Sequence, residues 1–226
     1  MHFIINLLHK DFSILLSDKK AAFDRPITIK CGKVTVSDGV TLKTPEAQSI
    51  FLTACSTVAL GIAGNVHDHV YIDTVQKITN IDDVLKSIRS HMECFLQLAN
   101  RSEIMQQQSW LENQSIATFF DPVGSAYFSN LFLFSKMHNH TRLYRSLDSG
   151  GILMHVGSGS MIFEKIVGRS RIEVFASSVS SVDLVDDYLE WFSDVFRKIS
   201  AVDNAVGRDF TGFISTRESP NFVPIK

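Results

Sequence analysis

The stretch that decides the fold is MHFIINLLHKDFSILLSDKK, residues 1–20. Two apolar runs, Phe3–Leu8 and Phe12–Leu16, stand on either side of a polar His9-Lys10-Asp11 turn. Both runs are too short and too rich in β-branched and aromatic residues for helices, so they predict a pair of strands. Their weak alternation of polar and apolar residues indicates strands that are buried on both faces.

Composition places the chain among single-domain soluble proteins. It has 226 residues, of which 45% are hydrophobic and 20% are charged, and we expect one domain over 1–226 with a polar tail at 217–226. A net charge of -2 favours neither nucleic acid nor an anionic membrane as a partner. No apolar run approaches the roughly 18 residues that span a bilayer. Cys31, Cys55 and Cys94 are scattered, as expected for free thiols in the cytoplasm.

Short apolar runs bounded by glycine-rich turns recur along the chain. Asp38-Gly39 is a strong hairpin signal, and Asp148–Gly151 and Gly157–Ser160 bound further runs. We predict strands at Ile27–Lys30, Lys33–Ser37, Val40–Leu42, Ile50–Thr53, Val58–Ala63, Asn130–Lys136, Thr141–Ser146, Ile152–Val156, Arg171–Ala176 and Asp209–Ser215.

Helical periodicity occupies the middle of the chain and one later segment. Apolar residues recur at helical spacing over 82–99, and we predict that Ser102–Phe120 continues as a second helix. The clearest helix spans Leu184–Ile199 and can be capped by Ser180 or Ser181.

The order of these elements predicts an α+β fold. Strands come first, then helices, then strands, a helix and a last strand. Antiparallel hairpins dominate, and the helices are segregated between them. Two antiparallel sheets sandwiched between two helical layers, a four-layer αββα arrangement, would bury both faces of each sheet.

At this level of detail the sequence resembles the proteasome β-subunit and HslV group of N-terminal-nucleophile (Ntn) hydrolases. Short motifs that together span nearly the whole chain stand in the family's order. These are DFSILLSDKKA (11–21), VALGIAGNVHD (58–68), NLFLFSKMHNHTRLYRSLDSGG (130–151), HVGSGS (155–160) and ISAVDNAVGRDFTGFIST (199–216).

The resemblance implies a catalytic mechanism, and His2 stands where its nucleophile belongs. In this family the first residue of the mature chain attacks the scissile carbonyl, and its free amine acts as the base. Counting back sixteen residues from Asp18 leads to His2, where the family has threonine. An imidazole has no hydroxyl or thiol with which to form the usual acyl-enzyme. Because removal of the initiator methionine generally needs a small second residue, we also expect Met1 to stay and block the amine.

The resemblance also implies a lysine at the start of the strand that precedes a glycine of the substrate groove. That lysine lowers the pKa of the amine by like-charge repulsion. Counting back from Gly64 leads to Ser49 or Ile50, and Lys43, the nearest lysine upstream, is out of register. We therefore expect the lysine to be absent.

Other parts of the family's site have a counterpart here. Asp18 corresponds to the aspartate that pairs with the lysine, Ser158 to the serine of the Gly-Ser-Gly turn, and Asp203 to the aspartate of the late loop, although Val206 replaces a nearby serine. Turn formation, helix capping and backbone freedom each explain these residues without catalysis. The predicted vestigial site comprises His2, Asp18, Ser49, Ser158 and Asp203, with Ala63, Gly64 and Gly157 lining the groove.

The favoured interpretation is a catalytically degenerate, pseudoenzyme member of the family that assembles with its own copies into a ring or chamber. It would act structurally beside an active partner subunit, or it would hold a peptide or protein substrate in its groove. The alternative is an active peptidase or amidohydrolase of altered mechanism that uses His2, Asp18 or Ser158, or one activated by processing.

No cofactor or metal is predicted. His67-Asp68-His69 and His138-Asn139-His140 have the residue types of a zinc site, but each lacks a third ligand at a suitable spacing. Joint use of the two pairs stays open. Gly157-Ser158-Gly159 lacks the Lys-Ser/Thr of a phosphate-binding loop.

Overall fold

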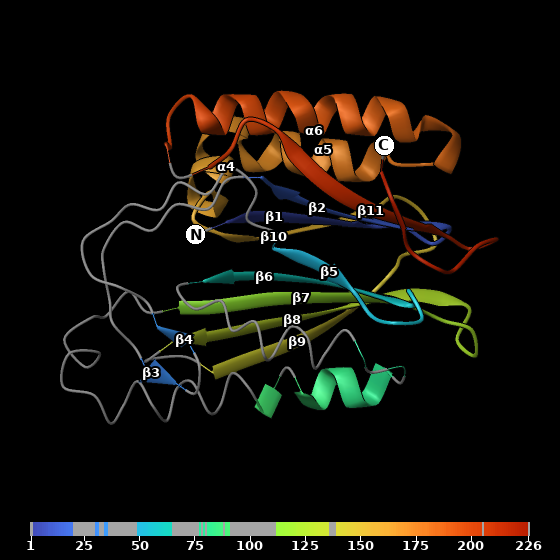
Figure 1. Ribbon diagram of the computed structural model, residues 1–226. Helices are drawn as coiled ribbons and strands as arrows, with labels where there is room; N and C mark the ends of the chain where they lie inside the picture. The colour runs from blue at the N-terminus through green and yellow to red at the C-terminus, as the bar shows by residue number, and fades with distance from the viewer. Residues whose placement is uncertain are drawn as a thin grey trace.

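The structure is a computed structural model that describes residues 2–19, 30–31, 34–35, 49–64, 77, 79, 81–87, 89–90, 112–135, 139–204 and 206–225. It has four layers, as predicted: helices, a sheet, a second sheet and a helical segment (Figure 1). Both large sheets are antiparallel and five-stranded. The predicted α+β sandwich of two antiparallel sheets is therefore confirmed.

The first sheet has the strand order β10-β1-β2-β11-β12. It contains four strands that the sequence predicts, namely Phe3–Leu8, Phe12–Leu16, Ile152–Val156 and Asp209–Ser215. The bounds of its strands are β1 (Phe3–Leu8), β2 (Phe12–Asp18), β10 (Ile152–Gly157), β11 (Phe210–Thr216) and β12 (Val223–Pro224).

The second sheet has the order β5-β6-β7-β8-β9, and a separate pair of short strands, β3 and β4, lies outside both large sheets. The predicted strand Val40–Leu42 lies outside the described residues. The bounds are β3 (Lys30–Cys31), β4 (Val34–Thr35), β5 (Ile50–Leu52), β6 (Val58–Gly64), β7 (Glu112–Asp121), β8 (Ala126–Ser135) and β9 (Asn139–Arg145).

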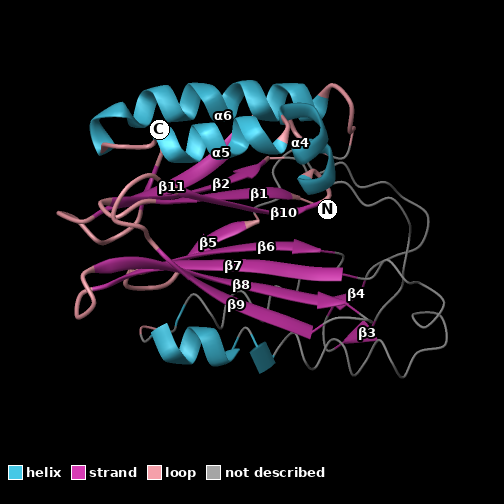
Figure 2. Ribbon diagram, turned by 180° about the vertical axis from the view of Figure 1, so that it is seen from behind, coloured by secondary structure: helices cyan, strands magenta, loops and turns pink. Residues whose placement is uncertain are grey.

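Three α-helices and a 3-10 turn cover the outer face of the first sheet, and residues 81–87 and 89–90 are helical on the far side of the second sheet (Figure 2). The bounds are α4 (Ser160–Val167), α5 (Arg169–Ser178), η1 (Val182–Leu184) and α6 (Val185–Ser200). In the part of the chain that the structure describes, no helix is long and apolar enough to cross a membrane.

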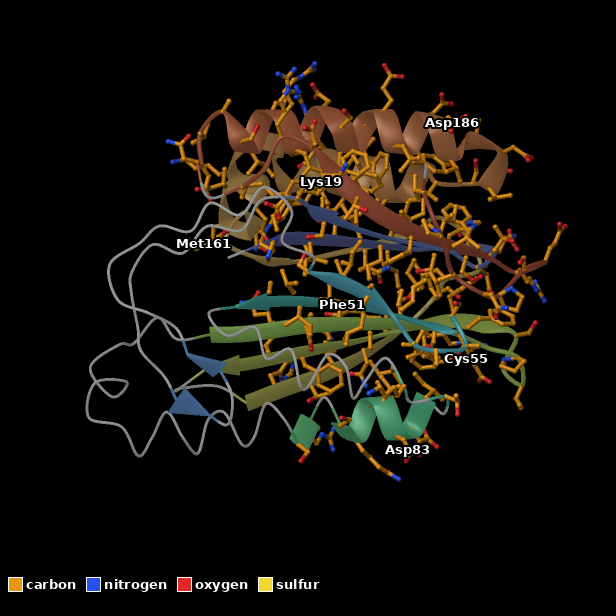
Figure 3. The ribbon with its side chains drawn as sticks, in the orientation of Figure 1. Lys19, Phe51, Cys55, Asp83, Met161 and Asp186 are labelled. Carbon is orange, nitrogen blue, oxygen red and sulfur yellow. The ribbon has the colours of Figure 1, made fainter. Side chains whose placement is uncertain are left out.

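Burial on both faces explains the nearly unbroken apolar runs of β1 and β2. On β1, Phe3, Ile5 and Leu7 pack in the core under the helices, while Ile4 and Leu8 pack between the two sheets. All five side chains are fully buried. Figure 3 shows side chains filling the space between the layers. Because a strand between two layers has no solvent face, the alternation that marks most antiparallel strands is lost.

The prediction for Ser102–Phe120 was wrong where the structure describes it, because Glu112–Asp121 forms the central strand β7. Its apolar residues mimic helical spacing because both of its faces are covered. Ile116 packs between the sheets, whereas Ala117 and Phe119 belong to the core beneath the helical segment. The strand ends where the Asp121 carboxylate accepts hydrogen bonds from Val123 N and Gly124 N, at 3.0 and 3.1 Å.

The strand predicted at Arg171–Ala176 is also wrong, since these residues lie in α5. The alternation of Ile172 and Val174 suggested a strand, but Val174 is 68% exposed. The residues that face the core are Ile172, Phe175 and Val179, which have helical spacing.

The predicted long helix is confirmed as α6. Ser181 Oγ accepts a hydrogen bond from Asp183 N at 3.2 Å and caps the 3-10 turn that leads into it. Acidic residues stand in its first turn and basic residues in its last turn, as the helix dipole favours. Its inner face contributes Tyr188, Phe192, Val195, Phe196 and Ile199 to the core.

The C-terminal segment predicted as a polar tail packs back onto the fold. Val223–Pro224 forms β12, which pairs with β11, and Phe222 is 1% exposed. The Phe222 N–H donates to Ser56 O at 2.7 Å, which ties the segment to the β5–β6 hairpin.

Candidate functional site

Three neighbouring strands bring the predicted site together at one end of the first sheet. In the antiparallel order β10-β1-β2, the start of β1 lies beside the ends of β2 and β10. Phe3 is opposite Gly157, and Ile4 is opposite Ser17. The N-terminus therefore lies beside the turn that leads into α4 (Figure 1).

Asp18 is the centre of this site. Its side chain is fully buried, and each of its carboxylate oxygens accepts a hydrogen bond from a backbone N–H. Oδ1 accepts from Phe3 N at 2.8 Å, and Oδ2 accepts from Gly207 N at 2.8 Å. One side chain thus joins the start of β1 to the loop before β11.

His2 lies against this carboxylate. The His2 side chain is fully buried, and its Nδ1 is 3.4 Å from Asp18 Oδ1. Its carbonyl oxygen accepts a hydrogen bond from Ser158 N at 3.3 Å. The structure therefore holds an imidazole and a carboxylate side by side, away from solvent, at the start of β1.

Gly157 and Gly159 allow the turn after β10 to approach the N-terminus closely. Gly157 has φ +96°, and a Cβ there would lie 2.8 Å from the carbonyl carbon of His2. A Cβ at Gly159 would lie 2.7 Å from the ring of Phe3. Between them, Ser158 is half-buried, and its Oγ is enclosed without a hydrogen-bond partner.

Ser49 occupies the position at which the resemblance implies a lysine. Its side chain is fully buried, and its Oγ forms a hydrogen bond with Ser17 Oγ. Ser17 Oγ is also 3.2 Å from Asp18 O, to which it donates. Ser49 is therefore linked to the Asp18 backbone through the Ser17 hydroxyl. Lys43 lies outside the described residues.

The predicted groove residues lie opposite this cluster. Ala63 is fully buried near the end of β6, and its Cβ is 3.2 Å from the position of a Cβ at Gly157. Gly64 ends the same strand. The Gly157 turn therefore lies close to Ala63 and leaves no room for a side chain at residue 157.

Asp203 is placed near the site but is joined to it through the backbone. It follows α6, where its N–H donates to Ile199 O at 2.8 Å and its carbonyl accepts from Val206 N at 3.1 Å. These bonds shape the loop whose Gly207 N–H reaches Asp18. The predicted role of the Asp203 side chain stays a prediction.

Sequence reasoning missed Gln114 and Ser17. The Oε1 atom of Gln114 accepts a hydrogen bond from Gly157 N at 2.7 Å, across the gap between the two sheets. The misassignment of 102–120 as helical hid Gln114, which is opposite Ala63 on the neighbouring strand. Ser17 had a usable signal, because it immediately precedes the aspartate that anchors the site.

The structure does not bring together a metal site from the residues it describes. No group of at least three histidine, cysteine, aspartate or glutamate side chains with metal-binding geometry occurs in that part of the chain. His67-Asp68-His69 and His138 lie outside the described residues, and His140 is exposed on β9. The zinc hypothesis for the two histidine pairs is therefore untested.

Comparison with known proteins identifies the fold. No family model matches the chain, and no curated protein matches it. Among solved structures, the chain is similar to Anbu (ancestral beta-subunit) from Yersinia bercovieri, with a TM-score of 0.53 and 11% sequence identity. The match covers 99% of this chain and 87% of that one. At this identity the similarity shows that the chain has a proteasome-like fold.

Proposed function

We propose that this protein is a non-catalytic proteasome-like subunit that assembles with its own copies into a ring or chamber. The observation that carries the proposal is the buried cluster of His2, Asp18 and Ser49. By the resemblance, His2 stands where a nucleophile is expected and Ser49 where a lysine is expected, and backbone N–H groups engage the Asp18 carboxylate beside His2.

The burial of His2 supports the absence of N-terminal catalysis. A nucleophile must reach a substrate carbonyl, and 0% of the His2 side chain is exposed. Beside it, the hydrogen bond from Gly157 N to Gln114 Oε1 joins the two sheets. The His2 and Asp18 side chains are buried, so neither offers an exposed nucleophile at this end of β1, and the site suits a structural role better than a hydrolytic one.

We expect copies of a chain with this proteasome-like fold to assemble into a ring. The similar solved structure is described as an ancestral beta-subunit, and the match covers nearly all of this chain. We infer a homo-oligomer in the cytoplasm, built beside or without an active partner subunit, that needs no cofactor.

The test combines intact mass with covalent labelling. The purified protein is weighed under denaturing and native conditions and then incubated with a peptide vinyl sulfone, which traps hydroxyl, thiol and amine nucleophiles. We expect Met1 to be retained, a native mass that is a multiple of the chain mass, and no adduct on the N-terminal peptide or on Asp18 or Ser158, with adducts on free cysteines distinguished by peptide mapping.

An adduct on the wild-type protein that disappears in His2→Ala would support the alternative, an active hydrolase of altered mechanism. Ser200→Ala is the matched control, since Ser200 lies at the end of α6 and bonds only locally to Arg197 O. A native mass of one chain would refute the proposed ring assembly. It would not affect the proposal that the protein lacks N-terminal catalysis.

A further inference from the structure

The two large sheets end in four edge strands, of which β9 is the longest. β12 has two residues and β5 has three, so both are short. β10 has six residues and is held at both ends, because Gly151 N, just before the strand, donates to Ala176 O at 2.7 Å and Gly157 N donates to Gln114 Oε1 at 2.7 Å. β9 has seven residues, and no strand that the structure describes pairs with its outer edge (Figure 2).

The pairing pattern identifies the backbone groups that point outward from β9. Ser146 N donates to Tyr127 O at 2.8 Å, so this pair is hydrogen-bonded in the antiparallel ladder between β8 and β9. Because such pairs alternate along a ladder, every second residue of β9 bonds to β8 and the others face away. Thr141, Leu143 and Arg145 therefore present their N–H and C=O groups at the open edge.

The side chains along this edge carry positive charge on both faces of the sheet. Arg142 and Arg145 are exposed and, being three residues apart in a strand, point to opposite faces. Arg142 lies over the ring of Tyr144, 5.0 Å from its centroid, and Leu143 between the arginines is 57% exposed. The neighbouring strand β8 contains no charged residue, and the nearest acid along the chain is the exposed Asp148 in the next turn.

We propose that the open edge of β9 binds an extended, acidic segment of another protein by strand addition. Such a segment would complete the outward hydrogen bonds of Thr141, Leu143 and Arg145, as an added strand does at any open sheet edge. Acidic residues on its two faces would pair with Arg142 and Arg145, and an apolar residue would cover Leu143. The net charge of the whole chain is -2, so the attraction is local to this strip.

A second copy of this chain is a poorer occupant. Two-fold pairing of β9 with itself would place Arg142 and Arg145 of both copies along one seam, and like charges in neighbouring strands destabilise the pairing. Charged side chains are a common protection of open edges against self-association. The same arginines thus disfavour the chain's own copy and favour an acidic strand.

The experiment uses the full chain and a short fluorescein-labelled peptide with the repeat Glu-Glu-Val, which places glutamate on both faces of an added strand, and binding is followed by fluorescence anisotropy. A peptide of the same length with the repeat Lys-Lys-Val is the matched probe. We expect saturable binding of the acidic peptide and none of the basic one. Arg142→Glu combined with Arg145→Glu should reverse this preference.

Two substitutions at Leu143 separate the backbone from the side chain. Leu143→Pro removes an N–H that points away from β8, so the fold is retained and peptide affinity should fall about tenfold. Leu143→Ala keeps that N–H and should cost less affinity. Circular dichroism confirms that both variants are folded.

Binding that is indifferent to Leu143→Pro and to the arginine reversals would overturn the proposal, as would no binding at about 1 mM peptide. Sedimentation of the wild-type protein and of Leu143→Pro addresses the second copy. Self-association that Leu143→Pro abolishes would assign this edge to the chain itself and would also overturn it.

Discussion

Gly157 offers the sharpest test of how the site is built. The substitution Gly157→Ala places a methyl group 2.8 Å from the carbonyl carbon of His2, closer still to its oxygen, and 3.2 Å from Ala63 Cβ. Both neighbours on the His2 side are backbone atoms, so no side-chain rotation relieves the overlap. The positive φ adds about 1–3 kcal/mol of strain for a residue with a side chain. We expect a total loss of about 4 kcal/mol or more in the free energy of unfolding.

Gly168→Ala is the matched control. Gly168 also has a positive φ, +83°, but a Cβ there meets no atom within 4 Å. Alanine lowers the conformational entropy of the unfolded chain equally in both variants. This offsets about 0.4–1 kcal/mol of the loss in the free energy of unfolding in each variant. Gly168→Ala should therefore lose only about 1–2 kcal/mol. The difference between the variants isolates the contact with His2.

The assay is urea unfolding followed by tryptophan fluorescence, with thermal unfolding as a second readout. A Gly157→Ala protein that is insoluble while Gly168→Ala is folded would agree with the prediction. Equal losses in the two variants would refute the reasoning, because they would mean that the turn does not press against the His2 backbone.

Two further predictions concern buried polar groups. Asp18→Asn replaces one acceptor oxygen by an NH2 group that faces either Phe3 N or Gly207 N, so we expect a loss of about 1–3 kcal/mol in urea unfolding. Burial raises the pKa of Tyr127 to about 12, although the hydrogen bond to Ser215 Oγ opposes the shift. Since the folded state holds this proton more tightly than the unfolded state, the resulting stability is complete below pH 10 and is lost as the pH rises from 10 to about 12.

Controls keep both predictions specific. Asp209 is exposed, so Asp209→Asn should leave stability within about 0.5 kcal/mol of the wild type. In Tyr127→Phe, the free energy of unfolding should fall less steeply above pH 10. In an ultraviolet titration of this variant, the tyrosine that ionises at the highest pH should be absent. An Asp18→Asn protein as stable as Asp209→Asn, or an alkaline profile unchanged by Tyr127→Phe, would contradict the respective argument.

The sequence predicts β1 and β2 well because their signal is local. Both runs are buried on two faces, and such strands are short and continuously apolar. The His2 and Asp18 positions follow from the same two strands, since an antiparallel pair brings the start of one beside the end of the other. The resemblance singled out these two residues, and the local pairing of β1 with β2 explains why they meet.

The elements that sequence reasoning misassigned depend on contacts far along the chain. In β7, Ile116 and Ala117 face different layers, and their spacing alone does not distinguish this from a helix. In α5, Phe175 stacks on Trp191 of α6, with ring centroids 3.8 Å apart, and this contact decides which face of the segment is buried. Neither partner can be identified from the local pattern. Gln114 was missed for the same reason, because its hydrogen bond to Gly157 crosses the two sheets.

The retention of Asp18 does not require catalysis. In the related mechanism an aspartate pairs with a lysine, and a buried carboxylate that loses its cation would be costly if nothing replaced it. Here Phe3 N and Gly207 N occupy both oxygens, and His2 lies 3.4 Å from one of them. The carboxylate therefore joins β1 to the loop before β11 whether or not a lysine is present. Ser49 bonds to Ser17, whose hydroxyl donates to the Asp18 backbone carbonyl. These contacts give the aspartate a structural role that involves no catalytic step.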